Sequence, residues 1–313
     1  DFLQQLKAHA NNQVRQGHFD EPTKFAQGFV EKYVNFMKKE IDKKHRILIL
    51  GASGFIGEAI YKELCSYFRT YGTYRTDNYS FDKNKHYFQY DIEEDDIFEI
   101  LDSIKPTIII SALRGNFSAQ VIAHAHISEY LVVNNAKLIF LSSANVFDAY
   151  SKFPSYELDK TLSHSMYGHF KIKIENMLLR LPKKHVAIIR LPMVFGTQSP
   201  RIKEIKAFLQ EGLPIEVFPN LIINVTTDTK VTQQIHYIIN RNKSGVFHLG
   251  SRDLVHHDDF IKEIIETLGH FKPLFKNVYT TNEARYLAVL SKVNNLPKHL
   301  QLQSEDIFKE LKV

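Results

Sequence analysis

A tyrosine and a lysine four positions apart, Tyr167 and Lys171, are the residues of this chain whose types and spacing best suit chemistry. They open the segment YGHFKIKIENMLLRL, whose apolar residues recur at helical spacing, so both side chains are expected on one helix face. An ammonium beside a phenol favours the phenolate, and one unit charge at about 4 Å in an effective dielectric of about 20 is worth roughly 4 kcal/mol. That is sufficient to lower a phenol pKa from ~10 toward neutrality. The pair therefore predicts a tyrosine that transfers a proton and a lysine that lowers its pKa.

The same Tyr-x-x-x-Lys spacing occurs at Tyr79/Lys83 and at Tyr156/Lys160. The first pair falls in a polar stretch, and the second follows Pro154 before any sustained helical periodicity. We interpret both as coincidences.

A serine pair supplies the third group that carbonyl chemistry needs, a hydroxyl that polarises the substrate. Ser142 and Ser143 end the apolar run KLIFL, which is expected to form a buried strand. Ligands of parallel α/β sheets bind beyond the carboxyl ends of the strands. We therefore expect Ser143 to join Tyr167 and Lys171 as a catalytic residue.

Three glycines spaced three apart, Gly51, Gly54 and Gly57, follow an apolar strand in RILILGASGFIG. Such a loop lets the backbone turn tightly and approach a pyrophosphate, and a helix that starts at about Phe55 would direct its free N–H groups at that anion. The alternative is a glycine-rich turn of purely structural use. We favour a dinucleotide site, and its expected loop residues are Gly51, Ser53, Gly54, Phe55, Ile56 and Gly57.

Arg75 stands at the end of the second expected strand, where NAD-binding folds place an acid that accepts hydrogen bonds from the ribose. An arginine cannot accept them but can pair with a 2′-phosphate, so NADP(H) is favoured over NAD(H). Asp77, two residues later, is an acid that could accept from the ribose and so favours NAD(H). The alternative interpretation of Arg75 is an exposed surface arginine without a role in binding. Asp91, after the third strand, is placed to accept from the adenine amino group, with Ile92 beside it.

The carboxyl ends of the remaining strands complete the expected site. Arg201, after the turn GTQSP, could meet a substrate phosphate or face water, and the former is slightly favoured. The further cofactor-binding residues are Ser111, Ala112, Leu113 and Pro192, and the substrate-binding residues are Asn145 and Arg201.

No metal site is expected. Adjacent residues such as His256 to Asp259 do not share a helix face, and acids before FIKEIIETL more simply cap a helix.

Strand and helix patterns alternate from Arg46 onward. This pattern predicts an α/β fold with a doubly wound parallel sheet of the Rossmann type. The expected strands are 46–50, 70–74, 86–90, 107–111, 137–141, 186–190 and 245–249.

Composition excludes several classes of protein. A chain of 313 residues with 44% hydrophobic content is long enough for one large domain with a smaller appendage. A net charge of +5 without a basic stripe argues against nucleic acid, and no apolar run approaches the ~20 residues of a membrane span. The single cysteine, Cys65, rules out an internal disulfide and fits a reducing compartment, so the cytoplasm is expected.

The first 45 residues are expected to form a helical extension, followed by a dinucleotide-binding domain over 46–193 and a mainly substrate-binding lobe over 194–313. The apolar residues of the extension recur at helical spacing and suit packing on the domain or on a partner chain, including a second copy. They are Phe25, Phe29, Tyr33, Phe36, Met37 and Ile41. The chain opens at Asp1 rather than Met, so we expect it to be either a trimmed chain or part of a longer polypeptide.

Four motifs together resemble the extended short-chain dehydrogenase/reductase superfamily: GASGFIG, the serines in LSSANVFD, YGHFK, and RLPMVFG after the sixth strand. Within it, the chain is similar to dTDP-4-dehydrorhamnose reductases and to the regulatory β subunit of methionine adenosyltransferase. The resemblance runs from Arg46 to the C-terminus and includes PSYE and NVTTDTKVTQQI. It implies a Ser/Thr-Tyr-Lys site, a nucleotide-sugar substrate, an NAD(P)H-binding Rossmann domain, and an interleaved C-terminal lobe in which GVFHLGS returns to the sheet.

The chain also departs from those families. Rhamnose-type reductases usually read Ser-Thr-Asp-Tyr where this chain has SSAN, residues 142–145, so an acid and an aromatic near the sugar are missing. Ala144 and Asn145 cannot supply the Asp-Glu pair of sugar dehydratases, and Cys65 lies far from the place that epimerase-reductases need. Members of these families often carry an asparagine after the fourth strand, and this chain has Gln120 there. They also normally begin at the first strand, so the N-terminal extension of this chain is a further difference.

Two hypotheses follow. The first is an NADP(H)-dependent reductase that acts on a keto group of a nucleotide-linked sugar. The second is a non-catalytic, NADP-binding regulatory or interaction module that keeps the fold.

Overall fold

The computed structural model describes residues 42–76, 81, 84–150, 152–269 and 272–312. The expected N-terminal helix, Asp77 and the Tyr79/Lys83 pair lie outside the described residues. The chain divides into two units, Asp1–Lys43 and Lys44–Val313. Apart from the first two residues of β1, the elements described below belong to the second unit.

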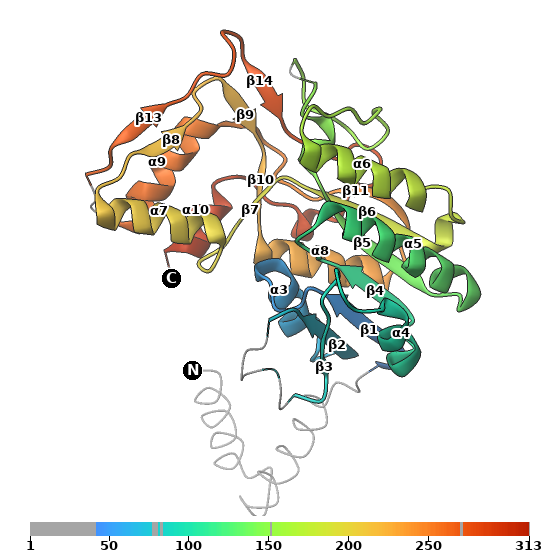
Figure 1. The fold of residues 1–313 in the computed structure, drawn as a ribbon. Helices are drawn as coiled ribbons and strands as arrows, with labels where there is room; N and C mark the ends of the chain where they lie inside the picture. Colours follow the sequence, from blue (N-terminus) through green and yellow to red (C-terminus); the bar gives the residue numbers. More distant parts are fainter. Residues whose placement is uncertain (1–41, 77–80, 82–83, 151, 270–271, 313) are drawn as a thin grey trace, which may run out of the picture. The chain divides into compact units, whose positions relative to one another are not determined.

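Seven parallel strands form the central sheet in the order β11-β6-β5-β4-β1-β2-β3 (Figure 1). The order reverses between β1 and β4, where a doubly wound sheet opens a crevice for ligands. The expected α/β Rossmann fold is therefore confirmed. The strands are β1 (Asp42–Leu50), β2 (Phe68–Tyr74), β3 (Tyr87–Gln89), β4 (Ile108–Ser111), β5 (Lys137–Ser143), β6 (Val186–Leu191) and β11 (Gly245–His248).

Helices cover both faces of this sheet because its strands are apolar on both faces. Along β1, Ile47 and Ile49 belong to one core, and Leu48 and Leu50 belong to the other. The first core includes residues of α3 (Phe55–Leu64) and α8 (Asp228–Asn240). The second includes residues of α4 (Ile97–Ile104), α5 (Phe117–Val133) and α6 (Met166–Leu178).

A smaller lobe follows β6 and has its own apolar core, which includes Phe195, Phe260 and Phe308. Its sheets pair β10 with β7, β13 with β8, and β9 with β12 and β14. Its helices are α7 (Pro200–Glu211), α9 (His257–Leu268) and α10 (Asp306–Leu311). Its strands are β7 (Met193–Phe195), β8 (Ile215–Val217), β9 (Leu221–Ile223), β10 (Val225–Thr227), β12 (Val255–His256), β13 (Phe275–Asn277) and β14 (Arg285–Leu287).

The lobe is interleaved with the central sheet, as expected. After β10 the chain returns through α8 to β11, and Gly245 to His248 pair in parallel register with Ala187 to Arg190 of β6. Helix α9 begins at His257, so Asp258 and Asp259 lie in its first turn rather than before it, where carboxylates favour the helix dipole. Among the described residues, no helix is both long and apolar enough to cross a bilayer.

A buried ion pair joins α6 to the sheet. Arg190 of β6 donates to Glu175 of α6 at 2.7 Å, and the two side chains are 3% and 1% exposed. Ser142, the neighbour of Arg190 across the strands, donates to Glu175 Oε1 at 2.5 Å. Arg190 also donates to the carbonyl of Glu157, whose carboxylate accepts from the backbone N–H groups of residues 292–294. Removing one partner of such a pair leaves an unpaired buried charge and costs about 3–5 kcal/mol.

Three buried histidines stay neutral in the folded protein. Burial and a nearby cation together lower the pKa of His124, His248 and His257 from 6.5 to about 4, and burial is the larger cause. The cations are Lys171, Arg190 and Arg201 respectively. The hydrogen bonds of His124 fix its tautomer: Nδ1 donates to the carbonyl of Gln120 at 2.6 Å, so Nε2 accepts from the Ser111 hydroxyl at 2.9 Å.

We expect the free energy of unfolding to fall as pH falls from about 6.5 to about 4. In this window the unfolded chain binds protons at these histidines and the folded chain does not. The slope for three sites reaches about 4 kcal/mol per pH unit. Urea unfolding followed by far-UV circular dichroism at several pH values in this window measures it.

Replacing one buried histidine tests the assignment. His124→Gln should reduce the slope by the equivalent of about one proton whatever its effect on stability at pH 7. The exposed His299 offers a matched control, and His299→Gln should leave the slope unchanged. A wild-type stability that stays flat from pH 7 to pH 5 would show that the buried histidines are not held neutral.

Candidate active site

The glycine loop between β1 and α3 has the geometry expected from its sequence. Gly51 has φ +78°, and a Cβ there would lie 2.8 Å from the carbonyl oxygen of Ala112. A Cβ on Gly57 would lie 2.2 Å from the carbonyl oxygen of Gly51, so the helix contacts the loop directly. Gly54 differs, because its φ is −85° and a Cβ would meet only the Gly51 oxygen at 3.4 Å. The fold itself therefore does not require glycine at position 54.

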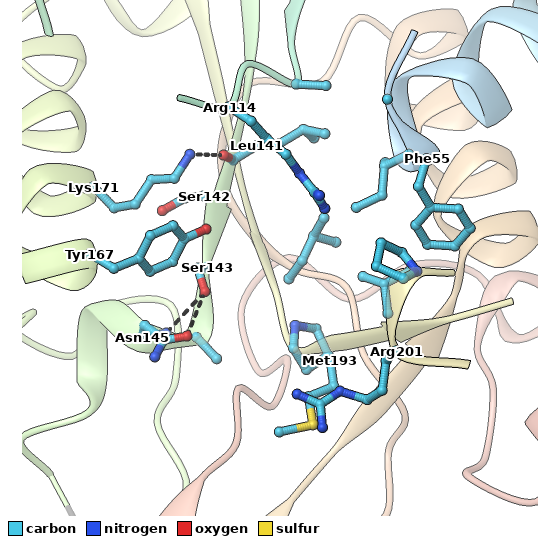
Figure 2. Close-up of a pocket in the computed structure, with 18 of the residues that line it drawn as sticks. Phe55, Arg114, Leu141, Ser142, Ser143, Asn145, Tyr167, Lys171, Met193 and Arg201 are labelled. Carbon is cyan, nitrogen blue, oxygen red and sulfur yellow. Dashed lines mark hydrogen bonds between the residues drawn. The ribbon is translucent and has the colours of Figure 1, made fainter. Parts of the chain in front are cut away.

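One cavity of about 710 Å³ lies between this loop, the ends of β5 and β6, and the starts of α6 and α7. Figure 2 shows Tyr167, Lys171 and Ser143 on one side of it and Phe55 on the other. Many of the expected site residues line this cavity: Gly54, Phe55, Ile56, Gly57, Ala112, Leu113, Ser143, Asn145, Tyr167, Lys171, Pro192 and Arg201.

The two serines at the end of β5 have separate roles. Ser142 is buried and its hydroxyl donates to Glu175. Ser143 lies in the cavity wall, where its hydroxyl donates to Asn145 Oδ1 at 3.0 Å and accepts from the Asn145 backbone N–H at 3.2 Å. Of the two, only Ser143 offers its hydroxyl to Tyr167.

Lys171 is almost completely buried beneath the cavity. It is 5% exposed, and its Nζ donates to the carbonyl of Leu141 at 2.8 Å (Figure 2). The same Nζ lies 4.6 Å from the ring centroid of Phe140. Burial lowers the pKa of the Lys171 ammonium to about 7, although the Glu175 carboxylate opposes this shift. The lysine therefore loses much of its charge close to neutral pH.

The phenol of Tyr167 does not have the lowered pKa that the Tyr-x-x-x-Lys spacing predicted. Burial raises the pKa of Tyr167 above 10.0, and only its hydrogen bond with Ser143 and the charge of Arg114 oppose that shift. Lys171 contributes no resolved lowering, since its ammonium is directed at Leu141 and is itself desolvated. That Lys171 lowers the pKa of Tyr167 stays a prediction.

Arg75 and Asp91, expected to hold opposite ends of an adenosine group, contact each other. Arg75 Nε donates to Asp91 at 2.9 Å, and Nη2 donates to Glu93 at 3.2 Å. A hydrogen bond from the Glu93 backbone N–H and the pairing with Arg75 hold the pKa of Asp91 below its usual value. The Arg75 side chain is 55% exposed, so a ligand phosphate could compete with these carboxylates.

Six expected cofactor residues do not line the cavity. The Ser111 side chain is buried and bonded to His124, so its hydroxyl is not available to a ligand. Ile92 packs against the apolar core beside α4. The six are Gly51, Ser53, Arg75, Asp91, Ile92 and Ser111.

Arg114, which was not among the residues expected from the sequence, lines the cavity directly after Leu113. The residue is exposed, and Figure 2 shows its side chain extending into the space between the Tyr167 side and Phe55. Its place just beyond the end of β4 was the signal that could have found it. Met193 and Glu204 also line the cavity and were not expected.

The parallel sheet, the glycine loop and the Tyr-x-x-x-Lys helix beside an interleaved lobe define a protein of the extended short-chain dehydrogenase/reductase type. The chain belongs to the family of the RmlD substrate binding domain, whose family model matches residues 45–306.

Two curated relatives are similar over part of the chain. A dTDP-4-dehydrorhamnose reductase of Aggregatibacter actinomycetemcomitans is 29% identical over 164 residues, which cover 48% of this chain and 52% of that protein. A methionine adenosyltransferase 2 subunit beta of Bos taurus is 25% identical over 186 residues, 56% of this chain and 55% of that protein. The chain thus spans about half the length of the curated relatives it matches.

Solved structures share the fold at low identity. A dTDP-4-dehydrorhamnose reductase of Bacillus anthracis in complex with NADP has a TM-score of 0.69 and 20% identity, covering 86% of this chain and 98% of that one. A dTDP-glucose 4,6-dehydratase of the same organism in complex with NAD has a TM-score of 0.72 and 18% identity, covering 86% and 95%.

Proposed function

We propose that this protein is an NADP(H)-dependent reductase of a keto group in a nucleotide-linked sugar. The observation that carries the proposal is that Ser143, Tyr167 and Lys171 line the same cavity as the glycine loop. Membership of the RmlD family and the named activity of the reductase relative support it. The single cysteine favours a cytoplasmic location.

The residues present fit a dinucleotide. Gly54 leaves open space where any side chain would project from the loop, and the N-terminal N–H groups of α3 follow directly. Ala112, Leu113 and Pro192 would line the dinucleotide from the ends of β4 and β6. The cofactor supplies a hydride when bound.

The protonation of the site suits reduction. A ketone that gains a hydride must also gain a proton, and the Tyr167 phenol, whose pKa burial raises above its usual value, carries that proton at neutral pH. Tyr167 therefore holds the proton at its hydroxyl, Ser143 orients and polarises the carbonyl, and Lys171 holds the ribose of the cofactor. Asn145 and Arg201, which line the same cavity, would contact the substrate, with Arg201 on a phosphate.

A regulatory module is the second candidate, and a specific observation favours it. The Ser143 hydroxyl donates its proton to Asn145, a residue that stands where rhamnose-type reductases carry an aromatic. The relative named as a subunit beta of methionine adenosyltransferase points the same way. Such a protein would bind NADPH, and no nucleotide-sugar would promote NADPH oxidation.

Tyr167→Phe should lower the rate of NADPH oxidation with a 4-keto nucleotide-sugar by at least about 100-fold, because the proton donor is lost while the ring remains. NADPH binding, followed by cofactor fluorescence, should change little. A variant that turns over like the wild type would exclude Tyr167 as the acid. Wild-type protein that binds NADPH but oxidises it with no such sugar would support the regulatory alternative.

Gly54→Ala should weaken NADPH binding by about tenfold or more, because its methyl group projects where the pyrophosphate must approach. The melting temperature should stay the same or rise slightly, since φ −85° suits alanine and the nearest atom is 3.4 Å away. Gly57→Ala is the contrasting variant and should lower the melting temperature, because its Cβ would meet a backbone oxygen at 2.2 Å. Unchanged NADPH affinity in Gly54→Ala would count against a dinucleotide at this loop.

Arg75→Ala should weaken NADPH binding by about tenfold and NADH binding by much less, if Arg75 pairs with the 2′-phosphate. Glu93→Gln should strengthen NADPH binding, because it removes a carboxylate that competes for the guanidinium. Arg69→Ala, at an exposed arginine near the start of β2, is the matched control and should change neither affinity. Equal losses for the two cofactors, or a wild-type preference for NADH, would refute the assignment.

A further inference from the structure

We propose that Asn116 is a positioning residue that helps to set the choice between NADP(H) and NAD(H). It acts through the carboxylate of Glu93 and takes no part in the transfer of hydride or proton. The inference rests on the dinucleotide site of the proposed function and adds a residue to its adenosine end. Its evidence is a group of hydrogen bonds that joins Asn116, Glu93, Arg75 and Asp91.

The Glu93 carboxylate joins two loops that lie apart in the sequence. Its Oε1 accepts from Arg75 Nη2 at 3.2 Å, and its Oε2 accepts from Asn116 Nδ2 at 3.3 Å. Glu93 follows β3 and Asn116 follows β4, and in the sheet β1 and β2 lie between those two strands. The two loops therefore converge beside the ends of β1 and β2, where the glycine loop and Arg75 also lie.

The backbone around Asn116 fixes its side chain independently of Glu93. Gly115 has φ +109°, which favours glycine, and Asn116 Oδ1 then caps α5 by accepting from two backbone N–H groups at 2.9 and 3.1 Å. Because Oδ1 is used in the cap, Nδ2 is the atom that reaches Glu93. A Cβ on Gly115 would lie 3.9 Å from Arg75 Nη1, so the guanidinium lies close to the same loop.

These side chains lie where the adenosine part of a dinucleotide is expected. The main cavity is lined by the glycine loop and by residues 112–114, but by none of Arg75, Asp91, Glu93 and Asn116. A dinucleotide that extends from the cavity toward the ends of β2 and β3 would reach this group of side chains. It would meet an arginine that is already paired with two carboxylates.

The two cofactors make opposite demands on Glu93. A 2′-phosphate is repelled by this carboxylate and must replace it at Arg75, whereas a ribose 2′-hydroxyl can donate a hydrogen bond to it. By binding Oε2, Asn116 keeps the carboxylate beside Arg75, which opposes the phosphate and favours the hydroxyl. The side chains of Arg75 and Glu93 are 55% and 36% exposed, so we expect an effect of a few fold.

Asn116→Ser separates this role from the helix cap. Serine caps a helix about as well as asparagine but lacks the amide nitrogen that reaches Glu93, so the melting temperature should change little. With the Kd of each cofactor measured by fluorescence, the ratio of Kd for NADH to Kd for NADPH should rise about threefold. A merely structural role would weaken both cofactors together, so an unchanged or lower ratio would overturn the proposal.

A double-mutant cycle tests whether Asn116 acts through Glu93. Glu93→Ala should raise the ratio more than Asn116→Ser, because it removes the carboxylate itself, and adding Asn116→Ser to it should cause no further rise. Glu94→Ala is the matched control, because Glu94 is exposed beside Glu93 while Arg75 pairs with Asp91 and Glu93. Additive effects in the double variant, or a rise in Glu94→Ala equal to that in Glu93→Ala, would contradict the proposal.

These measurements need cofactor binding but no sugar and no turnover. A ratio that shifts as expected, in a protein that oxidises NADPH with no keto sugar, would refute the reductase and leave the role of Asn116 intact. Turnover that depends on Tyr167, with a ratio that Asn116→Ser leaves unchanged, would do the reverse.

Discussion

The ion pair between Glu175 and Arg190 connects α6, β5 and β6, three of the elements that build the site. Glu175 lies one helical turn beyond Lys171 on α6, so its contact with β6 fixes the helix that carries Tyr167. Ser142 joins the same carboxylate and fixes the end of β5, next to Ser143. Through the Glu157 carbonyl the pair also reaches the segment at 292–294. An arrangement of these elements that broke this network would leave a buried charge unpaired, at a cost of about 3–5 kcal/mol.

Burial, which makes that pair possible, also decides the charges of the site. The spacing of Tyr167 and Lys171 predicted that the lysine would make the phenol acidic, an argument that treats the ammonium as fully charged. In the folded protein both groups lose water, so both neutral forms are favoured. The site thus holds a protonated phenol at Tyr167 and an amine at Lys171 that is only partly protonated near neutral pH. Arg114, which is exposed at the edge of the cavity, keeps a full charge. At neutral pH the phenol therefore carries a proton that it can donate, although its raised pKa makes it a weaker acid than a free phenol.

The fold could be predicted from the sequence because its signals are local. In strands such as β4, three successive isoleucines, 108–110, mark a buried strand, and glycine spacing marks the turn into α3, which begins at Phe55 as expected. The candidate site followed from two rules. The Tyr-x-x-x-Lys spacing indicated Tyr167, and the rule that ligands bind at the carboxyl ends of parallel strands indicated Ser143 and Pro192, which line the same cavity. The rule names a strand end and leaves the direction of each side chain open. For that reason it included Ser111, whose hydroxyl turns into the core toward His124, and stopped one residue short of Arg114.

Besides the direction of a side chain, the pairing of charged residues from different strands cannot be predicted from short stretches of sequence. Arg75 and Asp91 were each assigned to a different part of a cofactor, yet β2 and β3 are neighbours in the sheet and bring the two side chains to 2.9 Å. With Glu93 also bonded to Arg75, the charges of these three side chains sum to −1. A 2′-phosphate must therefore displace carboxylates from the arginine, whereas a ribose hydroxyl could donate to those carboxylates directly. The preference for NADP(H) over NAD(H) at this position therefore depends on the difference in binding free energy between these two arrangements. Asp91 and Glu93 contribute to that difference as much as Arg75 does.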